Sequence, residues 1–229
     1  MQQNLNLEAI RLVAYGLKEL KEKVVFVGGA VLGLYIDHPN SDPVRFTKDI
    51  DLTIELANLS AWATLQVRLA ELGFFPKSDD SVICRYLFNG VIVDLMPTID
   101  SPFGPTNIWY APGFQQAIYK EIEPGLSIKM LTLPYFIATK FVAFHGRGGD
   151  PRMSHDFEDI IFLCLNCSNI VSAIQETDTP VKSFLILEFQ KIWSDQYREE
   201  IICCHLQPER IAHQIKVISK NIIDIINLK

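Results

Sequence analysis

The sequence contains no apolar run of the roughly 18 residues that a membrane-spanning helix requires. Residues 1–4 carry neither the basic start nor the apolar stretch of a secretory signal. The sequence also lacks a clear disulfide pattern, because its five cysteines are an odd number that makes a poor disulfide framework. We therefore expect a cytoplasmic protein that has no membrane span.

The spacing of the cysteines could also indicate a zinc site. Cys164 and Cys167 are three residues apart, and Cys203 adjoins Cys204, a grouping that zinc sites also use. Both pairs lie in apolar stretches with a helical pattern, where cysteine packs as a small hydrophobic residue. We favour this packing role over zinc.

An excess of positive charge is also absent. The sequence has 21 Lys and Arg residues against 27 Asp and Glu, which gives a net charge of −6. A protein that coats nucleic acid by bulk charge is usually basic, so this class is disfavoured, whereas a small local site is not. With 48% hydrophobic and 21% charged residues, the composition is that of a globular chain of one large or two small domains.

Hydrophobic periodicity predicts an α+β part with a mixed sheet over residues 1–130 and a helical part over 131–229. Asn89-Gly90 lies between two apolar runs and is a strong hairpin signal, because both residues favour a positive φ. Pro134 suits the first position of a helix. The elements expected in the first part are a helix at 5–22, a strand at 24–27, a helix from 30, a strand at 49–54, a helix capped by Asn58 or Ser60, a hairpin of 82–88 with 91–96, and short strands within 116–130.

Gly28 and Gly29 follow the first expected strand directly and precede a helical pattern. Glycines at such a turn let the backbone approach a ligand, and the start of the next helix favours phosphate. Taken alone, the pattern is better explained by an ordinary tight turn. A dinucleotide-binding fold would need a different glycine spacing, and the antiparallel hairpin argues against that fold too.

Three aspartates lie on two of the expected strands. Asp49 and Asp51 are two apart, so they share one face of their strand. Adjacent carboxylates repel each other unless a cation lies between them, and oxygen ligands suit Mg²⁺. For this pair alone, a strand whose acids face water is an equal alternative. Asp94 lies in a second apolar strand, where a lone buried carboxylate would be costly, and three acids on adjacent strands can hold two metal ions.

The order of these motifs resembles the nucleotidyltransferase superfamily that includes DNA polymerase beta. The resemblance rests on Gly28-Gly29, on Arg-Phe-Thr-Lys-Asp-Ile-Asp-Leu over 45–52, and on Val-Asp-Leu over 93–95. It is closest to the branch of abortive-infection and toxin–antitoxin nucleotidyltransferases. In that branch the superfamily's Gly-Ser is Gly-Gly, and the first acid pair is commonly Asp-Ile-Asp-Leu preceded by Arg and Thr.

A later stretch extends this resemblance to about residues 20–165. Lys140 and Arg147 are two helical turns apart on one face, a spacing that suits a polyphosphate, although solvated surface cations are the alternative. Asp156 and Asp159 share a face of the next expected helix, which Ser154 can cap. By resemblance, Asp156 serves the active site, by orienting Lys140, Arg147 or the nucleotide; capping alone would also explain the acid.

The resemblance implies a minimal nucleotidyltransferase core at 1–130 and an enzyme that moves a nucleoside monophosphate from an NTP to an acceptor hydroxyl. Mg²⁺ or Mn²⁺ would be held by the three catalytic aspartates, with Asp94 nearest the attacking hydroxyl. The nucleotide would contact the residues Gly28, Gly29, Lys140, Arg147 and Asp156.

The implied acceptor is RNA, often a tRNA 3′ end, with a protein hydroxyl or a small molecule left open, and a toxin would have a cognate antitoxin. The alternative is a catalytically silent member that binds nucleotide or serves as a scaffold. Arg45, Lys48 and Arg85 flank the acids and either balance their charge or reach the substrate.

Overall fold

A computed structural model describes residues 2–37, 43–77, 84–99 and 106–229. The chain divides into two compact units: unit 1 comprises Met1–Leu34 and Pro43–Thr132, and unit 2 comprises Tyr35–Asp42 and Leu133–Lys229. The first residues of the strand expected at 82–88 lie outside the described residues.

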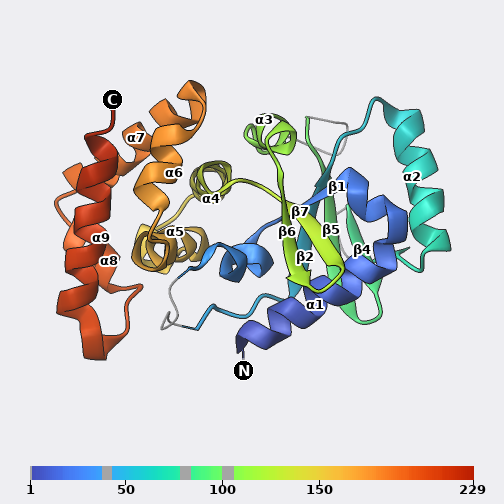
Figure 1. Cartoon of the computed structure of the whole chain (residues 1–229), viewed down its shortest axis with the longest axis horizontal. Coiled ribbons are helices and arrows are strands. Elements are labelled where there is room, and N and C mark those ends of the chain that lie inside the picture. The colour runs from blue at the N-terminus through green and yellow to red at the C-terminus, as the bar shows by residue number, and fades with distance from the viewer. Residues whose placement is uncertain (1, 38–42, 78–83, 100–105) are drawn as a thin grey trace. The chain divides into compact units, whose positions relative to one another are not determined.

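Within the described residues, unit 1 contains a seven-stranded mixed sheet (Figure 1). Its spatial order is β3-β4-β5-β2-β1-β7-β6. The pairs β1–β7 and β2–β5 are parallel and the other neighbouring pairs are antiparallel. The strands are β1 (Val24–Val27), β2 (Asp49–Ile54), β3 (Phe75–Pro76), β4 (Arg85–Phe88), β5 (Val91–Pro97), β6 (Ile118–Glu123) and β7 (Leu126–Met130).

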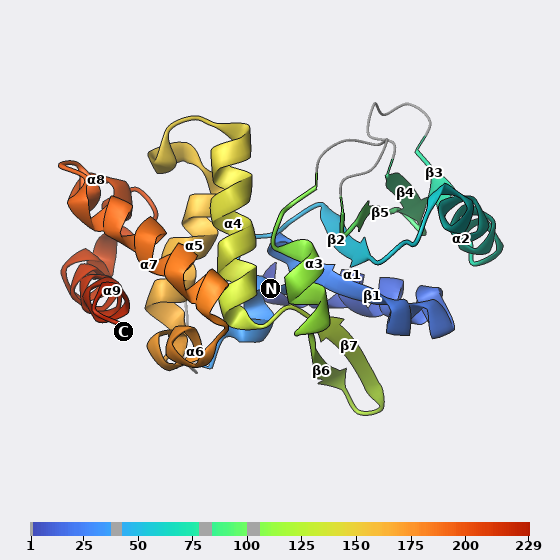
Figure 2. The same ribbon diagram turned by 90° about the horizontal axis from the view of Figure 1, so that it is seen from above.

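The expected hairpin joins β4 and β5. Asn89 has a φ of 47° and Gly90 a φ of 84°, the left-handed conformation that the Asn-Gly turn predicted. The second hairpin, β6–β7, ends the sheet; Figure 2 shows it extending away from the other strands of unit 1. Strand β1 is buried along its whole length, as its run of Val and Phe residues predicted.

The helical elements of unit 1 follow from their apolar faces. Helix α1 buries Ile10, Val13 and Leu17 and contacts β2. Helix α2 is capped by Asn58, whose side chain accepts a hydrogen bond from the Ala61 amide. The elements are α1 (Gln2–Leu17), η1 (Lys18–Lys23), η2 (Gly29–Tyr35), α2 (Leu59–Glu71) and α3 (Tyr110–Gln115).

The helix expected from residue 30 forms as η2, a short 3-10 helix. A 3-10 turn has poorer hydrogen-bond geometry and rarely extends beyond a few residues. The element therefore lacks the long aligned dipole on which the phosphate argument for this turn depended.

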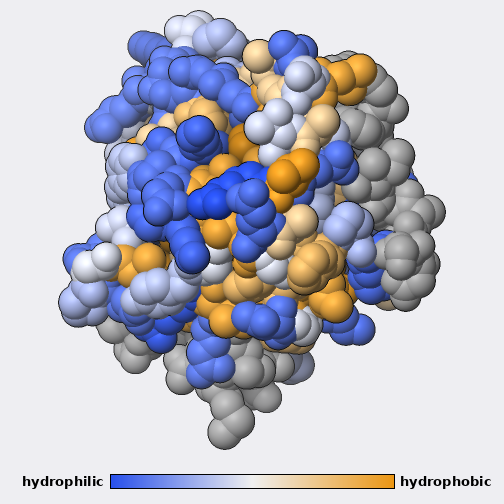
Figure 3. Space-filling model, turned by 90° about the vertical axis from the view of Figure 1, so that its right-hand side faces the viewer, coloured by the Kyte–Doolittle hydropathy of each residue, from blue (hydrophilic) through white to orange (hydrophobic). Residues whose placement is uncertain are grey.

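Helix α2 also contributes to an outer face of unit 1 that mixes polar and apolar side chains, as Figure 3 shows. Leu59 and Val67 of α2 are exposed, as are Phe75 of β3 and Leu87 of β4. Phe75 and Leu87 are directly opposite each other in the pair β3–β4, so these two exposed side chains are neighbours. Exposed apolar residues are normal on a folded protein, and we assign these positions no function.

All regular secondary structure in the described residues of unit 2 is helical, as expected for the C-terminal part (Figure 2). Helices α4, α5, α7 and α9 pack against one another. The helical elements are α4 (Leu133–Arg147), η3 (Pro151–Met153), α5 (His155–Asn166), α6 (Ile170–Glu176), α7 (Thr179–Ser194), α8 (Arg198–Cys203), η4 (Pro208–Arg210) and α9 (Ile211–Ile226).

A short upstream segment belongs to unit 2. The carboxylate of Asp37 accepts hydrogen bonds from the backbone amide of Ser168 at 3.0 Å and from its hydroxyl at 2.5 Å. The ring of Tyr35 packs on Phe136, with 4.7 Å between centroids. These contacts fasten the segment to α4 and to the residues that follow α5.

Among the described residues, no single helix has both the length and the apolar composition to cross a membrane. Helices α5 and α6 reach this length and apolar composition only as a pair, and the chain bends by 103° between them.

Candidate active site

The three predicted acids of unit 1 lie on neighbouring strands. In the parallel pair β2–β5, Asp51 is directly opposite Asp94. In the antiparallel pair β4–β5, Arg85 is directly opposite Asp94 on its other side. A row of charged residues, Arg85–Asp94–Asp51, therefore crosses three strands; we call it the charged row.

Asp49 joins this row because side chains two apart on a strand share a face. Ile50 and Leu52, on the opposite face of β2, are 2% and 0% exposed and belong to the core. The alternation places Asp49 and Asp51 together, as the sequence predicted, and the register brings Asp94 beside them. The backbone thus gathers all three carboxylates on one face of two adjacent strands.

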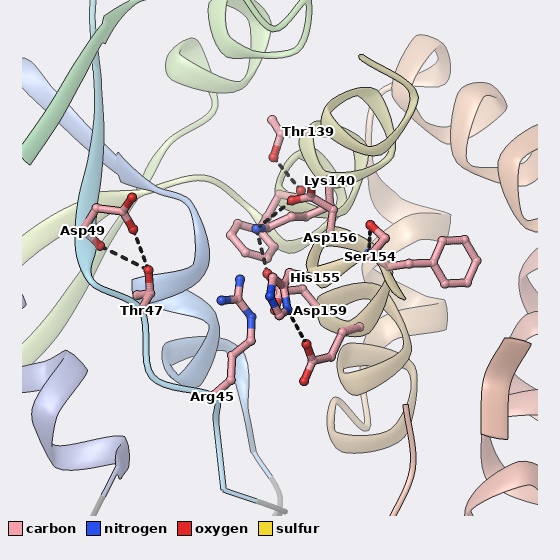
Figure 4. A network of polar contacts seen from close by, with 12 residues as sticks. Arg45, Thr47, Asp49, Thr139, Lys140, Ser154, His155, Asp156 and Asp159 are labelled. Atoms are coloured by element: carbon pink, nitrogen blue, oxygen red, sulfur yellow. Dashed lines mark hydrogen bonds and ion pairs between the residues drawn. The ribbon is translucent and has the colours of Figure 1, made fainter. Parts of the chain in front are cut away.

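Asp49 is oriented by a local hydrogen bond. The hydroxyl of Thr47 donates to Oδ1 of Asp49 at 2.6 Å, which Figure 4 shows as a dashed line. Thr47 lies just before β2, and its backbone amide donates in turn to the side chain of Asn6. The carboxylate of Asp49 is therefore fixed by residues outside its own strand.

Asp51 lies against the glycine turn. Gly28 has a φ of +70°, and a β-carbon placed on it would lie 1.8 Å from Oδ2 of Asp51. A β-carbon on Gly29 would lie 2.7 Å from the Nη2 atom of Arg45, which is the mobile end of a long side chain. Gly28 is thus required both by its backbone conformation and by Asp51, whereas Gly29 faces a neighbour that can move.

Asp94 is held by arginine. Nε of Arg85 donates to Oδ1 of Asp94 and Nη2 donates to Oδ2, each at 2.7 Å. Asp94 is only 8% exposed, and a charge-assisted, two-pronged pair satisfies a buried carboxylate well. Burial, and to a smaller extent the nearby negative charge of Asp94, raises the pKa of the Cys84 thiol. Cys84 therefore stays protonated at neutral pH.

The donor set of the charged row fits a divalent cation in chemistry and in backbone placement. Three carboxylates on one face are the hard oxygen ligands that Mg²⁺ prefers. Their side chains point to different neighbours, Asp94 to Arg85 and Asp51 to Gly28. Accordingly, in the described parts of the chain no three His, Cys, Asp or Glu side chains converge on one metal position.

Unit 2 holds the predicted cations on helix α4. Lys140 is 6% exposed, and its Nζ lies 2.7 Å from Oδ2 of Asp159 and 3.3 Å from Oδ1 of Asp156 (Figure 4). Both aspartates lie on α5, one turn apart. Lys140 is thus turned into the unit, so a direct contact with phosphate would require it to leave these carboxylates.

Arg147 is the exposed partner of the same cluster. Its side chain is 71% exposed, and it donates to Oδ2 of Asp156. Asp156 therefore orients both Lys140 and Arg147, and it is buried while doing so. Ser154 caps α5 by accepting from the Phe157 amide at 3.3 Å, so capping is done by the serine. Asp159 pairs with Lys140 as well.

One residue near the acids, Asn6, was not among the residues expected at the site. Asn6, 4% exposed, donates to the Arg45 carbonyl at 3.0 Å and accepts from the Thr47 amide at 3.2 Å. It connects helix α1 to the segment that carries Arg45 and Thr47. Its position four and seven residues before Ile10 and Val13, on the apolar face of the helix, was the available signal.

Comparison with known proteins agrees with this fold. No protein-family model matches the chain, and no curated protein sequence does. The crystal structure of an antigenic nucleotidyltransferase-like protein from Paracoccidioides brasiliensis is similar, with a TM-score of 0.53 at 15% identity. The similarity covers 93% of this chain and 99% of that chain. The protein therefore has a nucleotidyltransferase-like α+β fold.

Proposed function

We propose that the protein is a metal-dependent nucleotidyltransferase that transfers a nucleoside monophosphate from an NTP to an acceptor hydroxyl. The observation that carries the proposal is the placement of Asp49, Asp51 and Asp94 on one face of the neighbouring strands β2 and β5, next to the turn at Gly28. A fold similar to that of a nucleotidyltransferase-like protein supports it.

In the proposed reaction, the acceptor oxygen forms a bond to the α-phosphorus of the NTP. The bond from that phosphorus to the bridging oxygen breaks, pyrophosphate leaves with the electron pair, and the hydroxyl proton passes to a carboxylate or to water. Bound Mg²⁺ or Mn²⁺ supplies charge stabilisation to the triphosphate and the leaving group.

The residues of unit 1 have separate tasks in this proposal. Asp49, Asp51 and Asp94 would hold the metal, with Asp94 nearest the attacking hydroxyl. Thr47 fixes the direction of Asp49. Gly28 and Gly29 would hold the phosphates through the backbone of the turn after β1. Because the carboxylate of Asp51 fills the space beside Gly28, the phosphates would approach at Gly29, next to the guanidinium of Arg45.

In unit 2, Arg147 is the proposed phosphate contact, because it combines exposure with a fixed direction. Asp156 supplies that direction, and Lys140 supports Asp156. A guanidinium that a carboxylate already orients loses less freedom when it binds an anion. The phosphate contact expected of Lys140 itself stays a prediction.

RNA, often a tRNA end, is the acceptor that the resemblance to toxin-type nucleotidyltransferases suggests, and a protein hydroxyl is the next candidate. A toxin would be accompanied by an antitoxin. Incubation with each α-labelled NTP, Mg²⁺ and total RNA tests the proposal. Label should pass to RNA or protein in the wild type and in the surface control Asp224→Asn, and it should not in Asp49→Asn/Asp51→Asn.

A second candidate, a catalytically silent nucleotide-binding protein, is favoured by one observation: Arg85 pairs with both oxygens of Asp94. Calorimetry separates the two candidates. NTP binding without transfer of label to any acceptor would support the silent protein, whereas neither binding nor transfer would reject both.

A further inference from the structure

The charged row places a positive side chain on the acid that lies nearest the proposed reaction. Arg85 extends from β4 across to Asp94 of β5, and Asp51 of β2 lies on the other side of Asp94. We propose that Arg85 is a positioning residue that antagonises metal binding at Asp94. The metal binds tightly only when Arg85 releases the carboxylate of Asp94. This inference rests on the metal site of the proposed function.

The pairing geometry accounts for the antagonism. Arg85 uses two nitrogens and Asp94 uses both oxygens, each bond at 2.7 Å. The side chains are 22% and 12% exposed, so water weakens the interaction little. A carboxylate oxygen still has a second lone pair for a metal. However, a dication placed there would lie next to a fixed guanidinium and would be repelled by it.

The metal-free protein needs Arg85 for the same reason. Asp94 and Asp51 are directly opposed like charges, and Asp94 is almost buried. Removal of the arginine leaves a carboxylate that is neither well solvated nor neutralised, which costs stability. A divalent cation can take over that neutralisation, so the two cations are alternatives at one carboxylate.

The sign of the change in metal affinity on removal of Arg85 distinguishes antagonism from a purely structural role. If Arg85 merely builds the strand pair, its removal lowers stability and weakens metal binding, because the acids become less ordered. If Arg85 antagonises the metal, its removal lowers the stability of the metal-free protein but strengthens metal binding. Stability alone does not distinguish the two roles, whereas the metal affinity does.

Calorimetric titration with Mn²⁺ measures this affinity directly on the full chain. We expect the Kd for Mn²⁺ to fall by about fivefold or more in Arg85→Gln, the lower end of typical coupling between two ligands. Arg68→Gln is the matched control, because Arg68 lies in the same unit and pairs only with exposed Glu71 and Glu19 among the contacts described. Its Kd should equal that of the wild type.

Thermal melting gives a second readout. In EDTA, Arg85→Gln should melt at a lower temperature than the wild type, and saturating Mg²⁺ should raise its melting temperature by more than it raises that of the wild type. If Arg85→Gln does not fold, Arg85→Lys replaces it. Lysine keeps the charge but not the two-pronged geometry, so we expect a smaller fall in Kd, of about twofold.

An unchanged or higher Kd in the folded variant, or no Mn²⁺ binding by any variant, overturns the inference. Its failure is distinct from that of the proposed function. Label transfer by the wild type with an unchanged Kd in Arg85→Gln would keep the function and reject the antagonism. A lower Kd in Arg85→Gln with no transfer under any condition would keep the antagonism and reject the function.

Discussion

The carboxylate of Asp51 occupies the space that a side chain on residue 28 would need. A β-carbon on Gly28 would lie 1.8 Å from Oδ2 of Asp51 and 2.7 Å from its β-carbon. The β-carbon and the carboxylate of Asp51 cannot move away easily, because the backbone of Asp51 is fixed on the central strand β2. Asp51 is opposite Val27 on one side and Asp94 on the other. The glycine turn and the acid strand therefore depend on each other.

Gly28→Ala should destabilise unit 1 by about 3 kcal/mol or more, since it adds this collision to a strained backbone. Gly90→Ala is the matched control: its φ of +84° is similar, but nothing lies within 4 Å of an added β-carbon. It should cost only about 1–2 kcal/mol. Urea unfolding measures both, and equal losses would show that Asp51 does not fill the space beside Gly28.

Arg147→Gln should weaken NTP binding while it changes folding stability only a little. Because Arg147 is exposed, its ion pair with Asp156 contributes less than about 1 kcal/mol to folding. Loss of a charged phosphate contact should nevertheless weaken NTP binding about tenfold, as measured by calorimetry. Lys220→Gln, which removes an exposed cation paired with Asp224 in the same unit, should leave NTP binding unchanged. Unchanged binding in Arg147→Gln would remove this residue from the proposed site.

Asp156→Asn should behave differently from Arg147→Gln. It removes a buried negative charge that faces Lys140, which leaves the lysine with Asp159. The expected loss of stability is about 3 kcal/mol, because a buried ion pair loses one partner. NTP affinity should fall as well, since Arg147 loses its orientation. Thermal melting and calorimetry on the same sample measure both effects, and a fully stable variant would contradict the burial of this cluster.

Asn6→Ala tests whether helix α1 supports the acids from a distance. The variant leaves the Arg45 carbonyl and the Thr47 amide without their side-chain partner, at a cost of about 2 kcal/mol. Because Thr47 orients Asp49, Mn²⁺ affinity should also fall. Asn221→Ala removes a comparable bond to the Cys164 carbonyl in unit 2, so it should lower stability without changing Mn²⁺ affinity. Equal effects of both variants on the metal would refute the link.

Thiol labelling tests the packing role of the cysteines. Burial raises the pKa of Cys164, and it raises the pKa of Cys167 to about 12. Little thiolate is present at pH 8, so both should label slowly in the native protein, whereas exposed Cys204 should label fast. In denaturant all five should react. Fast native labelling of Cys164 or Cys167 would contradict their burial in unit 2.

Local signals predicted much of the fold. The Asn89-Gly90 turn, the Asn58 cap and the alternation through Asp49 and Asp51 each depend on residues close in sequence, so their patterns predicted the structure correctly. The central place of β1, parallel to β7, was not predictable in this way. Such pairing depends on contacts between residues about a hundred positions apart.

The candidate site, like the fold, was predictable from sequence only in part. The placement of three acids on one face followed from strand periodicity and from the resemblance. The partners of those acids did not, because Arg85 reaches Asp94 only through the strand register, and Lys140 is buried only through the packing of α5 on α4. Sequence indicated the residue types, whereas long-range packing determined where each charge points.

The most direct test of the central claim is simultaneous measurement of labelled acceptor and released pyrophosphate in the presence of Mg²⁺. The account predicts one pyrophosphate per nucleotide transferred by the wild type and by Asp224→Asn, with both products lost together in Asp49→Asn, Asp51→Asn and Asp94→Asn. Transfer that persists at the wild-type rate in all three of these variants would contradict it.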